Sequence, residues 1–590
     1  MARLLALACT FLATACSVAP PASTTIAPEA SSRARVPTDG PSAQMAVTAH
    51  PLATRAALAM LEKGGAPIDA AIAAQAMLGL VEPQSSGLGG GTLVMHWDER
   101  ARVLASYDGL SSAPARTTAS LRTETDGKLL ESEPSQRGGR SVGVPGTLAV
   151  LKLAHERHGR LPWRELFGPA IEQAEAGFPM PPYLHSILAQ PGAAAAHPDL
   201  LAPHFADGRP LPVGANVRNP AYAGTLRRVA IGGPRAYLEN GGAKAIVEAA
   251  QRGFRATLMT ERDVLDYRAA ERTPVCAPFL AYKVCTMAPP SFGGLFVLQV
   301  LQMVEARAGG RFEFDDPAFV HLYAEAGKLA QADRRQFVGD PDFVSVPVAA
   351  LADPAYARRR ATLIDLEAAR SPGPGQPVTA IAGLAPDEGD PVSATSQIAI
   401  ADAAGNAVSI TTTINLNFGS RLMVDGYVLN NAMSNFSAAP KLGEQIANQM
   451  APRKRPVTSM APTIVFDRDG RPVAVGGAAG GGPIVDYIAS SLIGMLANGL
   501  TPAQALAQGH VSTAVPGKLQ LEAGTPAQAL AGALAAKGHA VESVRLLSGL
   551  GFLKRTPEGW IGAADPRRDG IALGLAAPGG GEAFRRVPRY

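Results

Sequence analysis

The sequence carries almost no excess of charge. Lys and Arg number 54 and Asp and Glu 50, which leaves a formal net charge of +4 over 590 residues. So weak a field gives little attraction for a polyanion, and we therefore expect no nucleic-acid partner. The densest basic cluster, Arg453, Lys454 and Arg455, is typical of a solvated turn, although it can also help to attract an anionic substrate.

Aromatic residues are also scarce, at 5% of the chain, whereas the hydrophobic class as a whole makes up 47%. Ala and Gly supply much of this apolar share, which is enough for a large buried core. The chain is therefore predicted to be globular, and its length allows roughly one to four domains.

Cysteine is rarer still, with four in the whole chain. Cys9 lies in an apolar run at residues 4–12 that is too short to span a bilayer and is typical of a secretory signal. Cys276 and Cys285 are the pair left in the folded part, and the short segment between them can turn back and bring their Cα atoms within bridging distance. Export favours a disulfide, and two buried thiols are the alternative.

The end of the apolar run leaves two forms of the mature protein open. Residues 12–16 resemble a bacterial lipobox in which Cys16 is acylated, and an ordinary cut after Ala15 fits the small-residue rule equally well. The protein is thus expected to be either an outer-membrane-anchored lipoprotein or a soluble periplasmic protein. We assign residues 1–15 to the signal and residues 16–43, rich in Ala, Pro, Ser and Thr, to a flexible linker.

Motifs for metals and cofactors are missing. The glycine-rich turn from Gly87 follows a predicted helix, residues 68–81, and enters a predicted strand, residues 92–97, so it lacks the context of a dinucleotide loop. Residues 155–158 do not form H-E-x-x-H, and the middle of the chain, residues 144–356, is predicted to be mostly helical. We therefore expect no metal and no cofactor.

A β-hairpin follows this helical region. Residues 395–401 and 407–415 alternate in character around a turn at residues 402–406. Symmetric pairing places Thr395 opposite Thr413 and gathers the hydroxyl-bearing side chains on one face. The other face, predicted to be the buried one, carries Ile398, Ile400, Val408, Ile410 and Ile414. Threonine is common in strands, so this pattern alone is typical of a structural role.

The hairpin is not an isolated pattern. Together with its flanks it resembles the γ-glutamyltranspeptidase family, in an order that runs from about residue 45 almost to the C-terminus. The matching segments are residues 64–71, 82–91, 144–146, 289–294, 325–342, 395–397, 405–408, 413–415, 429–431, 454–460 and 477–481.

The resemblance implies an α/β fold of the N-terminal nucleophile type, a four-layer αββα sandwich. It also implies that the precursor cleaves itself between Ala394 and Thr395. The products would be a large subunit, residues 44–394, and a small catalytic subunit, residues 395–590, which stay together as a heterodimer.

The same resemblance makes Thr395 the nucleophile. Cleavage would free its α-amino group, and because such a group ordinarily has a pKa of about 8, it suits a base for the Oγ proton. Thr413 would orient that hydroxyl, and the backbone N–H groups of Gly480 and Gly481 would form the oxyanion hole.

The substrate end departs from the family. Leu110 stands where an arginine is usual, which removes a bidentate carboxylate contact, and Asn435 stands where an aspartate is usual. The positions that still match carboxylate contacts are Asn415, Thr458 and Ser459. Three functions follow: an amidase and acyltransferase for γ-glutamyl (glutathione-type) small-molecule or peptide amides, an acylase for glutaryl-like amides, and a non-catalytic envelope binding module.

Overall fold

The computed structural model of the chain describes residues 40–118, 136–190, 201–252, 255–378, 384–387, 394–437 and 444–575. The predicted signal peptide, Cys16 and nearly all of the predicted linker lie outside the described residues. No helix among the described residues is both long enough and apolar enough to cross a membrane.

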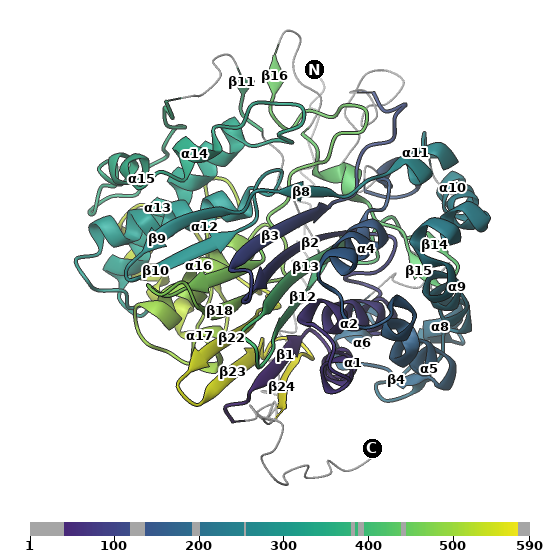
Figure 1. The fold of residues 1–590 in the computed structure, drawn as a ribbon. Helices are drawn as coiled ribbons and strands as arrows, with labels where there is room; N and C mark the ends of the chain where they lie inside the picture. Colours follow the sequence, from purple (N-terminus) through teal and green to yellow (C-terminus); the bar gives the residue numbers. More distant parts are fainter. Residues whose placement is uncertain are drawn as a thin grey trace, which may run out of the picture. The chain divides into compact units, whose positions relative to one another are not determined.

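Two antiparallel sheets form the centre of the described chain (Figure 1). The first has the strand order β24 (Ile571–Leu575), β1 (Gln44–Thr48), β12 (Ala394–Ala401), β13 (Ala407–Asn415), β2 (Gly91–Asp98), β3 (Val103–Gly109) and β8 (Ala270–Arg272). The second has the order β23 (Gly559–Ala564), β22 (Gly551–Thr556), β18 (Pro472–Gly477), β17 (Thr463–Phe466), β10 (Tyr282–Thr286) and β9 (Val275–Phe279).

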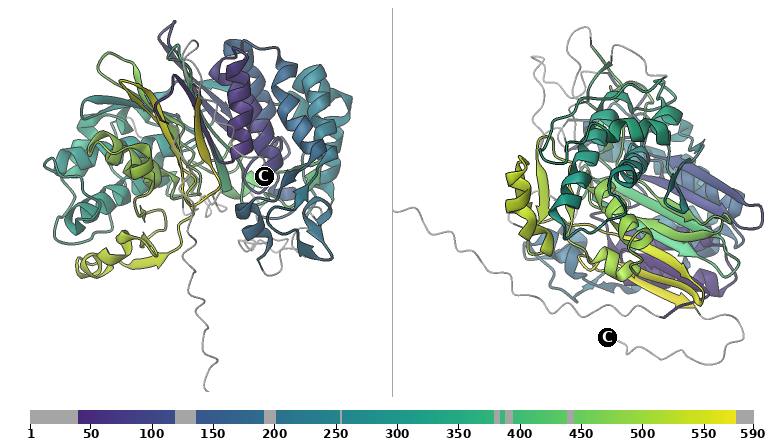
Figure 2. Two further views of the ribbon diagram at one scale, coloured as in Figure 1. Left: turned by 90° about the horizontal axis from the view of Figure 1, so that it is seen from below. Right: turned by 90° about the vertical axis from the view of Figure 1, so that its left-hand side faces the viewer.

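Helices cover the outer face of each sheet, which gives the predicted αββα order of layers (Figure 2, left). The helical layer on the outer face of the first sheet comprises α1 (Pro51–Glu62), α2 (Pro67–Val81), α4 (Thr147–His158), α5 (Gly168–Ala176), α9 (Pro220–Tyr237) and α10 (Ala243–Gln251), and α1, α2 and α4 contact its strands. The layer on the second sheet comprises α12 (Gly293–Arg307), α13 (Pro317–Phe337), α15 (Pro354–Ala361), α16 (Ile484–Leu496) and α17 (Pro502–Leu506), and α12 and α17 contact its strands. A third cluster, which includes Met45, Leu93, Ile464 and Val475, fills the space between the sheets.

Shorter elements surround these layers. The remaining helices are α6 (Pro182–Leu188), α8 (Leu201–His204), α11 (Glu261–Asp266), α14 (Val348–Leu351), α18 (Ala531–Ala536), the 3₁₀ helices η2 (Gly139–Ser141), η3 (Trp163–Phe167), η6 (Ala432–Asn435) and η7 (Pro526–Leu530), and the π-helical η5 (Leu238–Gly242). The remaining strands are β4 (Phe178–Pro179), β5 (Phe205–Ala206), β6 (Arg209–Pro210), β7 (Asn216–Val217), β11 (Leu384–Ala385), β14 (Met423–Val424), β15 (Tyr427–Val428), β16 (Gln445–Ile446), β19 (Val511–Ser512), β20 (Leu519–Glu522) and β21 (Val541–Val544).

The hairpin β12–β13 has the predicted register. Thr395 pairs with Thr413, Gln397 with Thr411 and Ala399 with Ser409. The prediction that only the isoleucine face is buried is wrong, because β12 and β13 lie inside the first sheet and the second sheet covers their other face. The polar side chains on that face satisfy one another: Gln397 accepts from Thr411 and donates to Ser409, which donates to the carbonyl of Gly476.

Two other predictions meet the structure differently. Helix α2 confirms the helix predicted over residues 68–81 almost to the residue, and it begins at Pro67. The mostly helical middle region, however, also contributes β8, β9 and β10, of which β8 and β9 lie at sheet edges and β10 pairs with β9 and β17. Cys276 on β9 and Cys285 on β10 are opposed in this hairpin and form a disulfide, with their Cα atoms 4.1 Å apart.

The basic cluster is solvated only at Arg453, and the prediction is wrong for its other two residues. Lys454 and Arg455 are only 3% and 8% exposed. Arg455 lies 3.4 Å from Asp108 and 3.5 Å from Asp342, and its backbone N–H donates to Asp340. The sequence pattern missed this because the compensating carboxylates come from distant parts of the chain.

Candidate active site

The hydroxyl group of Thr395 faces that of Thr413 across the hairpin. Thr395 donates over an Oγ1 to Oγ1 distance of 3.5 Å. The Oγ1 of Thr413 donates to the carbonyl oxygen of Ala394 and accepts from the backbone N–H of Asn415 at 2.8 Å. Thr413 therefore contacts both the candidate nucleophile and the carbonyl of the bond that is predicted to break.

The ladder is irregular at this point. The pairing register shifts between Ala394 and Thr395, so that Ala394 lies opposite Asn415. Irregularities of this kind re-aim side chains and are common beside active sites. Asn415 has a φ of 81°, and its Nδ2 donates to the carbonyl of Asn431 and to Ser434. Its buried Oδ1 accepts no hydrogen bond from the described residues.

A cavity of about 20 Å³ opens beside these groups. It brings together four of the five predicted substrate residues, Leu110, Asn415, Asn435 and Thr458. The rest of its lining is Gly91, Ser111, Thr413, Ile414, Asn430, Ala432, Pro456 and Val457. Every side chain in this lining is neutral, so the cavity itself offers no fixed charge to a substrate.

The fifth predicted substrate residue, Ser459, holds the glycine loop. Its Oγ donates to the carbonyl oxygen of Gly481 at 2.7 Å. Gly480 and Gly481 follow β18 and have φ values of 131° and 80°, which side-chain-bearing residues rarely adopt. A Cβ at Gly480 would lie 2.8 Å from the ring of Tyr487 and 3.1 Å from the carbonyl oxygen of Leu547. Glycine is therefore required here by both conformation and space.

Arg568 ties this loop region to the candidate nucleophile. Its Nη1 donates to the carbonyl oxygen of Thr395 at 2.8 Å, and its Nε and Nη2 donate to the carbonyls of Ser548 and Leu547. Local sequence does not mark Arg568, because it lies 173 residues beyond Thr395.

A buried carboxyl group lies on the other side of β12. Ser396 donates to Glu82 at 2.6 Å and accepts from Ser86 at 3.0 Å. Burial raises the pKa of Glu82 to about 7, against the opposing effects of Arg568 and of the Ser396 hydrogen bond. Sequence reasoning placed Glu82 in a matching segment without giving it a role.

Asp108 supports the segment that carries Leu110. Its carboxylate accepts from the backbone N–H of Leu110 at 2.9 Å and lies 3.2 Å from Arg272 as well as close to Arg455. The side chains of Arg272 and Arg455 are thus already paired with the carboxylate that holds the backbone of Leu110.

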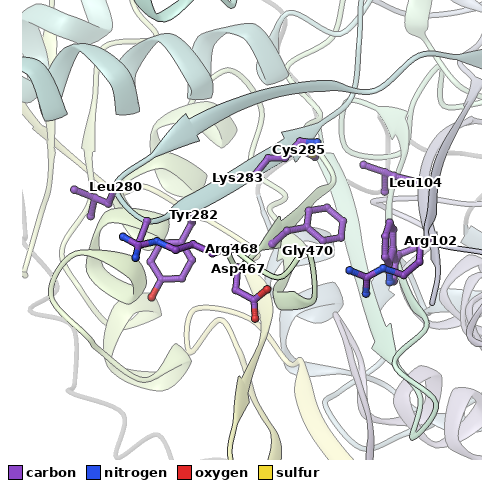
Figure 3. A pocket seen from close by; sticks show the side chains of 12 residues that line it. Arg102, Leu104, Leu280, Tyr282, Lys283, Cys285, Asp467, Arg468 and Gly470 are labelled. Carbon is purple, nitrogen blue, oxygen red and sulfur yellow. The ribbon is translucent and has the colours of Figure 1, made fainter. Parts of the chain in front are cut away.

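A much larger cavity, of about 680 Å³, lies elsewhere (Figure 3). Its lining includes Trp97, Arg102 and Gly470. Trp97 pairs with Ala407, at the turn end of β13, whereas Thr413 pairs with Gly91 at the opposite end. Six residues along a strand span about 20 Å, so this cavity does not include the threonine pair.

The four layers and the threonine at the start of a central strand define the class of N-terminal nucleophile hydrolases. A model of the γ-glutamyltranspeptidase family matches residues 53–575. The glutathione hydrolase proenzyme of Bacillus subtilis (strain 168) is 32% identical over 90% of this chain and 91% of its own length. The acylase ACY 1 proenzyme of Pseudomonas sp. (strain SE83) is 35% identical over 91% of this chain and 95% of its own.

A solved structure has the same fold. The cephalosporin acylase from Bacillus halodurans superimposes with a TM-score of 0.79 at 26% identity, over 92% of this chain and 98% of that one. The chain belongs to the γ-glutamyltranspeptidase family, whose members are hydrolases and transferases.

Proposed function

We propose that this protein is a self-processed N-terminal threonine amidase, and that the acyl group of its substrates carries no α-ammonium. The single observation that supports this specificity is the neutral lining of the cavity beside Thr413, with Leu110 and Asn435 in place of charged partners. The resemblance to both an acylase and a glutathione hydrolase proenzyme supports the broader class.

Processing would begin at Ala394. The Oγ of Thr395 attacks the carbonyl carbon of Ala394, the C–N bond breaks with transfer of a proton to the nitrogen, and water hydrolyses the resulting ester. Thr413 supports this step because its hydroxyl donates to the carbonyl oxygen on which negative charge develops. The large and small subunits would then be residues up to 394 and residues 395–590.

The new α-amino group of Thr395 would act as the base for substrates. It accepts the Oγ proton as Oγ bonds to the acyl carbon, and returns the proton to the leaving amine as the amide C–N bond breaks. The N–H groups of Gly480 and Gly481 stabilise the oxyanion, and water or an amine then takes the acyl group from the ester. No step in this sequence uses a metal or a cofactor.

The direct test compares glutaryl-p-nitroanilide with γ-glutamyl-p-nitroanilide. We expect a higher kcat/KM for the glutaryl compound, because Leu110 and Asn435 give no charge to an α-amino acid group. The double variant Leu110→Arg, Asn435→Asp should shift the ratio toward γ-glutamyl by roughly 10-fold or more, since a hydrogen bond to a charged group contributes about 1.5–3 kcal/mol. Leu280→Arg, at an exposed leucine that does not line this small cavity, adds the positive charge of the Leu110→Arg change elsewhere and serves as its control.

The second candidate is a γ-glutamyl amidase of the glutathione hydrolase kind. The Oδ1 of Asn415, which accepts no hydrogen bond within the described part of the chain, favours it because this acceptor suits an N–H donor on the substrate. A wild-type preference for the γ-glutamyl anilide would establish this candidate in place of the acylase.

The non-catalytic binding module is disfavoured by the enzymatic relatives, and a chain that neither processes itself nor turns over either anilide would revive it.

We infer that the mature protein is exported. The disulfide between Cys276 and Cys285 supports an oxidising compartment. Fractionation of the wild type beside Cys16→Ala separates the two forms: membrane-bound wild type and soluble variant indicate a lipid anchor, and soluble protein in both cases indicates a periplasmic enzyme.

A further inference from the structure

Three side chains with metal-binding atoms meet outside the candidate active site. His321 and Glu325 lie one turn apart on α13, and His539 lies in the turn that precedes β21. One ligand atom from each lies within 4.8 Å of the other two. All three side chains are buried, with exposed fractions of 0%, 2% and 5%.

The hydrogen bonds fix the proton positions of the two imidazoles. Nε2 of His321 lies 2.8 Å from the carbonyl oxygen of Asp365, which can only accept, so this nitrogen carries the proton. Nδ1 of His321 therefore directs its lone pair toward Nε2 of His539, 2.7 Å away. An imidazole that donates its other N–H to a backbone carbonyl is the usual arrangement of a metal-binding histidine.

A cation already lies in this cluster. Nζ of Lys328 is 2.7 Å from Oε1 of Glu325 and 3.3 Å from Nδ1 of His539. The other oxygen of Glu325 accepts from the backbone N–H of Arg370 at 3.0 Å, which fixes the carboxylate. The Lys328 side chain is 20% exposed, so its ammonium group can reach solvent without unfolding the cluster.

We propose that His321, Glu325 and His539 form a zinc-type metal site in which Lys328 competes with the metal ion. Two imidazole nitrogens and one carboxylate oxygen, with water in the fourth position, are a common zinc ligand set. Metal–ligand distances of about 2.1 Å place tetrahedral ligand atoms about 3.4 Å apart. Metal binding therefore requires the distance between the two imidazole nitrogens to increase from 2.7 Å and the carboxylate oxygen of Glu325 to move closer to them.

Binding changes the tautomer of His539 but not its proton count. The proton of His539 moves from Nε2 to Nδ1. The lone pairs of His539 Nε2 and His321 Nδ1 then bind the ion, and the ammonium of Lys328 leaves toward solvent.

The site joins the two halves of the chain. His321 and Glu325 precede the predicted cleavage point, and His539 follows it. If the proposed processing takes place, the metal links the large subunit to the small one on the far side of the second sheet, away from Thr395. This linking role rests on the proposed function, whereas metal binding itself does not.

Zinc titration of EDTA-treated protein tests the site. We expect one zinc ion per chain by calorimetry and by mass spectrometric metal analysis. His539→Gln should weaken binding by more than roughly 100-fold, and Lys328→Met should tighten it by roughly 10-fold or more, the scale of an outer partner. His185→Gln, a histidine bonded to the carbonyl of Leu211 far from α13 in sequence, should leave the affinity unchanged.

Two further measurements keep the outcomes distinct. The metal site is overturned if neither the wild type nor Lys328→Met binds stoichiometric zinc, a result that does not depend on how well His539→Gln folds. It is also overturned if the wild type and His539→Gln bind zinc with equal affinity. The uncleaved variant Thr395→Ala should bind zinc as the wild type does, so a failure of processing is seen separately. In the processed protein, zinc should raise the urea concentration that separates the subunits, and no such rise overturns the linking role.

Discussion

At the scale of single residues, the hydroxyl group of Thr413 contacts both Thr395 and Ala394, the two residues that flank the bond predicted to break. It accepts from Asn415 and donates to the carbonyl of Ala394, while Thr395 donates to it. One hydroxyl group thus aligns both the attacking and the attacked atoms before cleavage. Orientation of this kind is a large part of what an active site contributes.

The first prediction removes that hydroxyl. Thr413→Val should slow self-cleavage by roughly 10²–10³-fold, the usual effect of losing one preorganised donor, and Thr413→Ser should retain most of the rate. The time course of fragment formation on denaturing gels measures it. Thr411→Val is the control, because Thr411 lies on the same face of the same strand and its hydroxyl donates to Gln397. Equal slowing by both substitutions would show that Thr413 acts through stability alone.

The second prediction concerns Glu82. Its pKa is raised from 4.5 to about 7, so the neutral form is the one that the fold favours. The stabilising effect is complete below about pH 4.5 and is lost as the pH rises through about 7. Glu82→Gln keeps an oxygen for Ser396 and cannot ionise. Its free energy of unfolding should therefore fall less than that of the parent over this interval, by up to about 3 kcal/mol.

Urea unfolding at several pH values measures the effect. Both proteins should carry Thr395→Ala, so that a single uncleaved chain unfolds. Parallel pH profiles for the two chains would contradict the assigned pKa.

At the scale of elements, the loop after β18 depends on two glycines in unusual conformations. Ser459 anchors the carbonyl of Gly481, and Tyr487 and Leu547 leave no room for a Cβ at Gly480. The N–H groups of the loop are thereby held in place without help from the substrate, which is what an oxyanion hole requires.

The third prediction is that Gly480→Ala lowers kcat by roughly 10²-fold or more, because the loop must shift to admit the methyl group. Gly499→Ala is the matched control: it also has a positive φ, of 68°, but a Cβ there meets nothing within 4 Å. Both variants are compared as processed protein, with anilide turnover and the thermal midpoint as readouts. A similar kcat in the two variants would remove Gly480 from the site.

Sequence patterns predicted elements well where the signal was local. Alternation and a turn were enough to predict the register of β12 and β13, and the helix predicted over residues 68–81 is α2. Alternation of polar and apolar residues does not distinguish a strand with one solvent-exposed face from a strand that is covered on both faces, so the burial of Gln397 and Thr411 was missed. The ion pairs of Arg455 were missed for a related reason, because Asp108 and Asp342 are distant in sequence.

The candidate site divides in the same way. Thr395, Thr413 and the glycine loop carry the family's motifs, and four of the five substrate positions line one cavity. Arg568 and the His321, Glu325 and His539 cluster depend on how separate parts of the fold meet, and no spacing in the sequence reveals them.

At the scale of the whole molecule, residues on either side of Ala394 are interleaved. In the first sheet β12 lies between β1 and β13, and β24 pairs with β1 on its other side. In the second, β17 pairs with β10. A single cut at the start of β12 leaves these hydrogen bonds intact.

The fourth prediction is that the fragments co-elute as one species in native buffer and separate only in denaturant, as size-exclusion chromatography with and without urea would show.

The proposed function requires that Thr395 cleaves its own chain and becomes the nucleophile. The intact mass of purified wild type beside Thr395→Ala tests this. We expect two wild-type fragments, one of them residues 395–590 with a free N-terminal threonine, and a single whole chain for the variant. A whole wild-type chain, or a variant that splits at the same bond, would contradict it.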